Sequence, residues 1–423
     1  MPTLLLLAAG APAPPALAWI TPFALLLLAI AVLPLVAHHW WERNRNRAIV
    51  AATLALPAVV WAFLERPGEL LHAADEYAAF CLMLTCLFVV SGGLVLEGDL
   101  PATPRVNTTF LAVGALLANL VGTTGAAMLL VRPLLRTNAR RKRVVHTFVF
   151  FIFVVCNTGG CLTPLADPPL YLGYLEGVPF GWTLRLFPYW LAMNGALLAI
   201  YHVWDRRAHR RETSADLAFD ASRRTPLRLR GKANLLGLLG VVALVALRTP
   251  SPWLEVGFAA IAAISYRATP RALHELNGFT WTPIVEVAIL FAGIFATMVP
   301  ALAILDARGA ELGITTPGGF FWATGLLSGV LDNAPTYMMF LSVAQSLGLG
   351  TDVVGTSHAV LVAISLGAVF MGANTYVGNG PNFMVRAIVE SQGVKMPSFF
   401  GYMRYSALVL VPLYVVLWLV VFR

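Results

Sequence analysis

Stretches of about 20 apolar residues alternate with short polar loops along most of the chain. Clear examples are residues 19–40, 76–96 and 400–422. An α-helix rises 1.5 Å per residue, so about 20 residues cross the roughly 30 Å hydrocarbon core of a bilayer. A β-barrel needs short segments of alternating apolar and polar residues, which are not seen here. The pattern therefore predicts an all-α polytopic membrane protein.

About ten transmembrane helices are expected. They cover residues 17–37, 48–64, 76–97, 143–175, 183–204, 232–247, 253–267, 284–305, 357–390 and 402–422. The fourth and the ninth are too long for simple crossings and have polar centres rich in Gly and Pro, so we expect two broken helices there. The first residues, 1–18, leave a cleaved signal and a retained N-terminus as alternatives, because an apolar run lacks a preceding basic segment.

Two further apolar segments, 107–136 and 318–347, have polar, turn-like centres. The first centre is VGTTG at 121–125, and the second is LDNAP at 331–335. Each half of such a segment has about 13 residues, or roughly 20 Å of helix, which is too short to cross a bilayer. The sequence therefore predicts two re-entrant hairpins.

Landmarks of the first half of the chain recur in the second half. Three pairs lie at nearly the same spacing: Glu76 and Glu286 at the starts of spans, Gly122 and Asp332 at the hairpin tips, and Asp167 and Asn379 in the broken helices. Five crossings separate the two copies, so they run through the membrane in opposite senses. Inverted repeats with broken helices are typical of secondary transporters. The expected divisions are scaffold helices in 1–64, a first repeat in 65–204, a cytoplasmic linker in 205–231, scaffold helices in 232–283 and a second repeat in 284–423.

Composition and charge agree with a membrane location. The chain is 58% hydrophobic and only 12% charged, which is outside the range of soluble domains. Its net charge of +8 comes from basic residues between the spans, so the positive-inside rule explains the charge without a nucleic-acid partner. Most of the 29 Lys and Arg residues fall on one side if the loop 37–47 is cytoplasmic. We therefore expect both termini to lie outside the cytoplasm, which is the periplasmic side if the membrane is a bacterial inner membrane.

Polar side chains gather where the predicted helices break. A broken helix persists at membrane depth only beside protein or a solvated cavity, and its free backbone groups can bind ions. The alternative is that these side chains only cap buried helices. The candidate ion- and substrate-binding residues are Thr123, Thr124, Asn157, Thr158, Thr163, Asp167, Asp332, Asn333, Thr336, Asn374, Thr375, Asn379 and Asn382.

Asp332 and Asp167 are the candidates for coupling to protons. A carboxylate at membrane depth is costly and marks a functional site by default. Burial favours its protonated form and a bound sodium ion its ionised form, so one aspartate can exchange a proton for a cation. The alternatives are an N-cap role for Asp332 and a solvated loop position for Asp167. Asp332 and Asn374 are the expected sodium ligands. Neither an enzyme motif nor a cofactor motif is present, so we expect no catalysis.

The segments GTTGAAMLLVRPLL, NTGGCLTPLADPPLYLGYL, LDNAPTYMMFL and GANTYVGNGPNFM resemble the ion transporter superfamily. The chain is most similar to bacterial sodium:proton antiporters and citrate-transporter proteins of that superfamily. These are related to D-type sodium/proton antiporters, arsenite permeases and divalent anion/sodium symporters. The resemblance implies homodimers that work by an elevator mechanism, in which a transport domain moves against a scaffold.

The residues at the hairpin tips bear on whether the protein exchanges cations or carries organic anions. Divalent anion symporters carry Ser-Asn-Thr at both hairpin tips, whereas the tips here read Gly-Thr-Thr-Gly and Asp-Asn-Ala-Pro. An aspartate at a tip fits poorly with a trianion such as citrate unless a cation neutralises it. We therefore expect a sodium:proton antiporter, and a sodium- or proton-coupled symporter of citrate or other di- and tricarboxylates is the alternative. The expected partners are the lipid bilayer, monovalent cations and, in the alternative, an organic anion.

Overall fold

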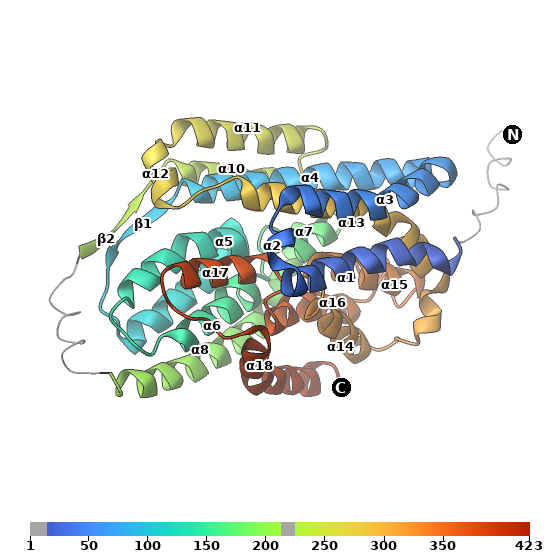
Figure 1. Cartoon of the computed structure of the whole chain (residues 1–423). Helices are drawn as coiled ribbons and strands as arrows, with labels where there is room; N and C mark the ends of the chain where they lie inside the picture. Colours follow the sequence, from blue (N-terminus) through green and yellow to red (C-terminus); the bar gives the residue numbers. More distant parts are fainter. Residues whose placement is uncertain (1–14, 213–224) are drawn as a thin grey trace, which may run out of the picture.

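The computed structural model describes residues 15–212 and 225–423 (Figure 1). The first residues of the chain and the middle of the expected linker lie outside this part. Most of the described residues are helical, and there is one small two-stranded sheet. The all-α membrane fold expected from the sequence is therefore present apart from that sheet.

The elements of the first half are η1 (Leu17–Ile20), α1 (Thr21–Val36), α2 (His38–Trp41), α3 (Asn44–Glu65), α4 (Pro67–Gly92), β1 (Val95–Asp99), α5 (Pro104–Thr137), α6 (Val145–Phe153), η2 (Val154–Thr158), α7 (Pro168–Leu175), η3 (Phe180–Leu186) and α8 (Phe187–His209). Those of the second half are β2 (Thr225–Arg230), α10 (Asn234–Ala246), α11 (Trp253–Ala268), α12 (Arg271–Leu276), α13 (Thr282–Arg308), η4 (Gly309–Leu312), α14 (Pro317–Ser328), α15 (Asn333–Ser346), α16 (His358–Met371), η5 (Gly372–Asn374), α17 (Gly380–Ser391) and α18 (Phe399–Val421).

Seven helical segments of the described chain are long and apolar enough to cross a bilayer. They are Leu17–Val36, Asn44–Glu65, Pro67–Gly92, Pro104–Thr137, Phe180–His209, Thr282–Leu312 and Phe399–Val421. Pro104–Thr137 is the first expected hairpin, so the other six segments correspond to six of the ten expected spans. The two broken helices do not appear among them because they are divided into short pieces. In addition, α10 has 13 residues and α11 has 16. As helices these measure about 20 and 24 Å, less than the thickness of the hydrocarbon core.

Both expected hairpins are present as helices that turn back on themselves. α5 leaves helical geometry at Gly122, and the amides of Asn107 and Asn138 exchange two hydrogen bonds of 2.9 Å at its two ends. Those residues lie far apart along a straight helix, so the bonds require the chain to reverse at Gly122. α14 and α15 form the second hairpin, in which the rings of Phe320 and Phe340 lie 6.4 Å apart.

Each hairpin begins with the same local signal. Thr103 accepts a hydrogen bond from the backbone N–H of Val106, and Thr316 accepts one from that of Gly319. A proline follows each threonine. A hydroxyl at the N-cap and a proline in the first turn both favour a helix start, so these residues set where the hairpins begin.

The start of α4 differs from the expectation. Glu76 was expected at the start of a span, but α4 begins at Pro67, where a proline is favoured in the first turn. Glu76 therefore lies in the third turn and is buried. Glu286 lies near the start of α13, as expected, and pairs with Arg47 at 2.9 Å.

The two-stranded sheet was not expected from the sequence. β1 pairs with β2 in antiparallel register, with Val95 opposite Arg230 and Glu97 opposite Arg228. β1 was expected to belong to the span 76–97 and β2 to the linker 205–231. Five or six residues of mixed character do not define a strand until a partner supplies the hydrogen bonds.

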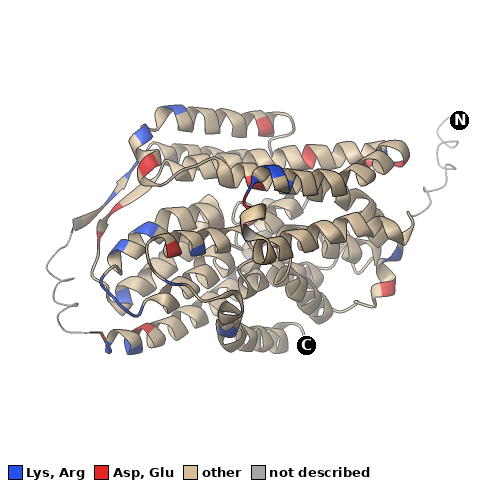
Figure 2. Cartoon of the chain, viewed as in Figure 1, with Lys and Arg blue, Asp and Glu red and all other residues tan. Residues whose placement is uncertain are grey.

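The helices are arranged in layers (Figure 1). α4 packs against α3, α5, α10, α11 and α13, and in Figure 1 α10 and α11 lie at one edge of the molecule. α8 and α18 lie near the opposite edge, and the hairpins and broken helices lie between the two edges. Lys and Arg concentrate around the end that holds β1, β2 and the C-terminus of α8 (Figure 2). The two hairpin tips and the interrupted centres of the two broken helices, called the polar breaks below, are therefore in the interior, away from this basic end.

Candidate functional site

The carboxylate of Asp167 joins all four polar breaks of the chain. It accepts hydrogen bonds from Thr123 at the first hairpin tip (2.9 Å), from Asn333 at the second tip (2.5 Å) and from Asn379 in the second broken helix (3.0 Å). Asp167 itself lies in the first broken helix, directly before α7, and is 1% exposed. Asn379 lies 212 residues from Asp167 along the chain. These four side chains form the centre of the candidate site.

The first broken helix opens through a wide turn. α6 continues into η2, a π-helical turn, before the helix ends. The side-chain amide of Asn157 donates to the carbonyl of Ile152, and the hydroxyl of Thr158 donates to that of Phe153. π turns leave carbonyls of an α-helix without their usual partners, and these two side chains supply the missing donors.

The second broken helix is held by its own asparagines and threonine. Thr375 accepts hydrogen bonds from the backbone N–H groups of Val377 and Gly378. Asn382 donates to the carbonyls of Gly372 and Thr375 and accepts from Asn157 at 2.8 Å. The pair Asn157–Asn382 therefore links the two broken helices directly.

Helices α8 and α18 support the two breaks in the same way. In α8, Trp190 and Asn194 donate to the carbonyls of Gly159 and Thr158. In α18, Tyr402 and Ser406 donate to the carbonyls of Ala373 and Asn374. Each pair of donors is spaced one helical turn apart. Buried carbonyls need such partners because water does not reach them.

The first hairpin tip docks against the first broken helix through glycines. The backbone N–H of Thr123 donates to the carbonyl of Ala166 at 2.8 Å. Gly122 adopts φ 76° and ψ 158°, a conformation almost restricted to glycine. A Cβ on Gly160 would overlap the methyl group of Thr123. Larger residues at these two positions would push the tip away from Asp167.

The second tip places Asn333, and not Asp332, against Asp167. The carboxylate of Asp332 accepts a hydrogen bond from the backbone N–H of Ala334 at 3.1 Å and is half-buried. Thr336 donates to the carbonyl of Asp332 one turn later. Asp332 is thus the N-cap of α15, which was the alternative expected for it, while Asn333 is fully buried.

Several buried oxygen atoms near this centre have no hydrogen-bond donor. They are the side-chain carbonyl oxygens of Asn157, Asn333 and Asn374. A Cβ on Gly372 would lie 3.1 Å from the oxygen of Asn157 and 3.6 Å from the amide nitrogen of Asn333. The two amides therefore converge on Gly372. Buried polar atoms without partners are rare in proteins and indicate a missing ligand, water or ion. Amide oxygens are ligands for hard cations.

A small cavity lies beside the first tip. It has a volume of about 70 Å³ and is lined by Gly122, Thr123 and Thr124, by Ala166 and Pro168, and by residues of α4 and α13. Pockets for larger organic ligands are usually 300–1,000 Å³. In this conformation the cavity has room for a small ion and a few water molecules rather than for a tricarboxylate.

Asp167 has neutral partners, unlike the other fully buried aspartate. Asp205 pairs with Arg141 and His146 near the base of the first hairpin. Within the described part of the chain, no Lys, Arg or His forms an ion pair with Asp167, and its partners are one hydroxyl and two amides. A buried carboxylate without a counter-charge is costly, so it favours a bound proton or cation.

The other expected site residues lie around this centre without touching Asp167. Thr163 donates to the carbonyl of Asn119, Thr158 donates to Asn194, and Thr124 lines the cavity. Asn119 and Asn194 were not among the expected residues, although each is buried and bonds the backbone of the first break. An asparagine inside an apolar helix can be recognised from the sequence as a candidate site residue, because polar groups are costly at membrane depth.

The fold and this site together define a multi-pass membrane transporter. Long apolar helices surround helical hairpins and broken helices whose polar groups meet in the interior. A family described as "Putative citrate transport" matches residues 13–422, nearly the whole chain. The chain belongs to this family, which confirms the resemblance noted from its motifs. No curated protein matches the chain in sequence.

Proposed function

We propose that this protein is a cation-coupled secondary active transporter that exchanges sodium ions for protons at Asp167. The observation that carries the proposal is the set of contacts that Asp167 makes with both hairpin tips and the second broken helix. A protonated Asp167 suits a buried site without a counter-charge, and a sodium ion can replace that proton. The unpaired oxygens of Asn157, Asn333 and Asn374 supply further ligands for the ion.

The proposed transport cycle moves the site as a unit. α5–α8 and α14–α18 carry the hairpins and broken helices, and α1, α3, α4, α10, α11 and α13 form a scaffold. The support for two inverted repeats is the agreement between α8 and α18: both have 23 residues, and both donate hydrogen bonds to the carbonyls of a helix break. Such repeats favour an elevator mechanism in a homodimer. The basic end of the molecule would face the cytoplasm of a bacterial cell, with both termini periplasmic.

Exchange can be tested in proteoliposomes that contain a pH-sensitive dye and have an acidic interior. Sodium, lithium or potassium is added outside, and efflux of protons relieves the quenching of the dye. We expect sodium or lithium to relieve it with the wild-type protein. Asp167→Asn is expected to respond no faster than protein-free vesicles, because a neutral amide cannot bind or release the proton.

The matched controls are two other acidic positions. Glu311→Gln changes an exposed carboxylate that pairs with Arg308, and it is expected to exchange at the wild-type rate. Asp332→Asn keeps an oxygen that can accept from Ala334, so it is expected to retain exchange. Full exchange by Asp167→Asn, or loss of exchange only in Asp332→Asn, would contradict the proposal.

A second candidate function is symport of citrate or another di- or tricarboxylate with sodium ions or protons. The family match favours this candidate. It predicts that a sodium or proton gradient drives uptake of labelled citrate or succinate into the same vesicles. Such uptake, together with no dye response to any cation, would move the assignment from antiport to symport.

A further inference from the structure

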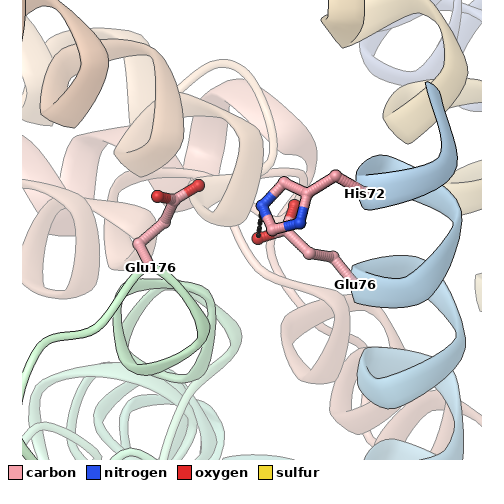
Figure 3. Close-up of side chains that lie close together, drawn as sticks. All are labelled: His72, Glu76 and Glu176. Atoms are coloured by element: carbon pink, nitrogen blue, oxygen red, sulfur yellow. Dashed lines mark ion pairs between the residues drawn. The ribbon is translucent and has the colours of Figure 1, made fainter. Parts of the chain in front are cut away.

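A second polar cavity lies apart from the Asp167 site, between α4, α13 and the end of α7. Its volume is about 350 Å³, and Gly68, Glu69, His72, Glu76, Glu176 and Asp306 line it together with apolar residues of α13. His72, Glu76 and Glu176 point toward one another in Figure 3, and each offers one ligand atom within 4.8 Å of the others. Two elements that are far apart in the sequence therefore meet at three metal-ligating side chains.

Glu76 provides independent evidence for a ligand. Its side chain is 9% exposed, and its Oε1 atom has no hydrogen-bond donor although it is buried. The Nε2 atom of His72 lies 3.6 Å from Oε1, which is too far for a hydrogen bond. A buried carboxylate oxygen without a donor is costly unless a proton or a cation binds it.

The other acidic residues of the cavity already have partners. Glu69 pairs with Arg66 at 2.7 Å, and Asp306 accepts a hydrogen bond from Ser342 at 2.5 Å. His72, Glu76 and Glu176 are therefore the three side chains that remain for a shared ligand.

The geometry suits a tetrahedral metal ion. Zinc binds histidine nitrogen and carboxylate oxygen at about 2.0–2.1 Å, which places tetrahedral ligand atoms about 3.3 Å apart. His72 and Glu76 lie one turn apart on α4 and are already close to that separation. Glu176 comes from the end of α7 and needs to approach by at most about 1.5 Å. Imidazole nitrogen and carboxylate oxygen both bind zinc, and three protein ligands with one water molecule complete a four-coordinate site.

We propose that His72, Glu76 and Glu176 bind a divalent cation of the zinc type and that this ion ties α4 to α7. Glu176 directly follows α7, and Asp167 directly precedes it. α7 has eight residues, so the two carboxylates are separated by a rigid rod of about 12 Å. A metal ion bound to Glu176 therefore restrains α7, the helix that begins directly after Asp167. If the proposed function holds, the ion also slows transport, because it bridges the scaffold and the moving part.

Metal binding can be measured without any transport. Purified full-length protein is treated with a chelator, and Zn²⁺ alone is titrated into it by calorimetry. We expect one ion per chain for the wild type. His72→Ala and Glu176→Gln are each expected to weaken binding by at least about tenfold, because each removes a ligand. Both side chains are more exposed than Glu76, so these variants avoid disturbing the buried residue.

The matched control is His39→Ala, which removes an exposed histidine that also lies beside a glutamate. It is expected to bind Zn²⁺ as the wild type does. Absence of binding to the wild type, or equal binding by all three variants, would overturn the metal site.

The link to transport is tested separately in the dye assay. Zn²⁺ is expected to slow exchange by the wild type and to leave Glu176→Gln at its own metal-free rate. Binding of Zn²⁺ without any slowing would overturn the proposed bridge. If no vesicle shows exchange even without metal, the proposed function fails, and the calorimetry still decides the metal site.

Discussion

At the residue scale, the two fully buried aspartates of the described residues are held in opposite ways. Asp205 accepts hydrogen bonds from Arg141, His146 and Asn107, so its charge is compensated. Asp167 accepts only from neutral groups. A compensated carboxylate stays ionised and holds structure together, whereas an uncompensated one gains from binding a proton or a cation. This difference supports a structural role for Asp205 and the exchange role proposed above for Asp167.

The structural role of Asp205 can be tested by neutralising it. Asp205→Asn removes the carboxylate closest to the buried guanidinium of Arg141 and leaves it only the more distant Glu212, at 4.0 Å. Removing one partner of a buried ion pair typically costs about 3–5 kcal/mol. The variant is expected to unfold at a clearly lower temperature in a thermal denaturation of the purified protein. Glu97→Gln is the matched control, because it breaks the exposed pair with Arg230 and should cost no more than about 1 kcal/mol. Equal unfolding temperatures for the two variants would refute this role.

The sequence pointed to both aspartates of the breaks and favoured Asp332, which was also an expected sodium ligand. Asp332 and Asp167 both precede a proline-containing helix start and both lie in polar breaks. What separates them is tertiary structure. The side chain of Asp332 bonds its own helix, whereas that of Asp167 makes no capping bond and meets two hairpins instead. No local pattern shows which of two such side chains will face the rest of the site.

At the element scale, the hairpins and broken helices were predictable within a few residues. Their apolar halves are too short to cross a membrane, and their centres hold glycine, proline and polar residues that end helices. The pairing of β1 with β2 could not be predicted, because it joins segments about 130 residues apart. The zinc-type cluster was missed for the same reason: His72 and Glu76 share a helix, but Glu176 comes from a distant turn.

The turn of the first hairpin depends on Gly122. Gly122→Ala places a side chain on a backbone of φ 76° and ψ 158°, which costs about 1–3 kcal/mol. A Cβ there would also lie 3.3 Å from the carbonyl oxygen of Leu165. We expect a lower unfolding temperature and slower exchange, because the tip shifts away from Asp167.

Gly195→Ala is the matched control for that change. Gly195 is exposed within α8, and a Cβ there would meet no atom within 4 Å. Alanine favours helix over glycine by up to about 1 kcal/mol, so this variant should be at least as stable as the wild type. If Gly122→Ala and Gly195→Ala behave alike in both assays, the turn does not position the tip.

At the scale of the whole molecule, one short helix connects the two polar regions. α7 begins beside Asp167 in the interior and ends beside Glu176 in the second cavity. α4 contacts both α5 and α7, and α13 contacts α15, so the proposed scaffold touches elements of both hairpins. A movement of the hairpins against α4 and α13 would therefore change both regions together. Such coupling between the Asp167 site and the second cavity would depend on how the helices pack together and not on any one segment.

The central claim is that a sodium ion displaces a proton from Asp167. The most direct test is to add sodium to purified protein in a weakly buffered detergent solution and to record proton release with a pH indicator. The measurement is repeated between about pH 5 and 9, the range in which a perturbed carboxyl group can titrate. Potassium addition serves as the ionic-strength control.

We expect sodium to release up to about one proton per wild-type chain at some pH in this range. Asp167→Asn is expected to release none, while Asp332→Asn releases protons as the wild type does. Equal release from Asp167→Asn, or no release from the wild type at any pH tested, would contradict the account.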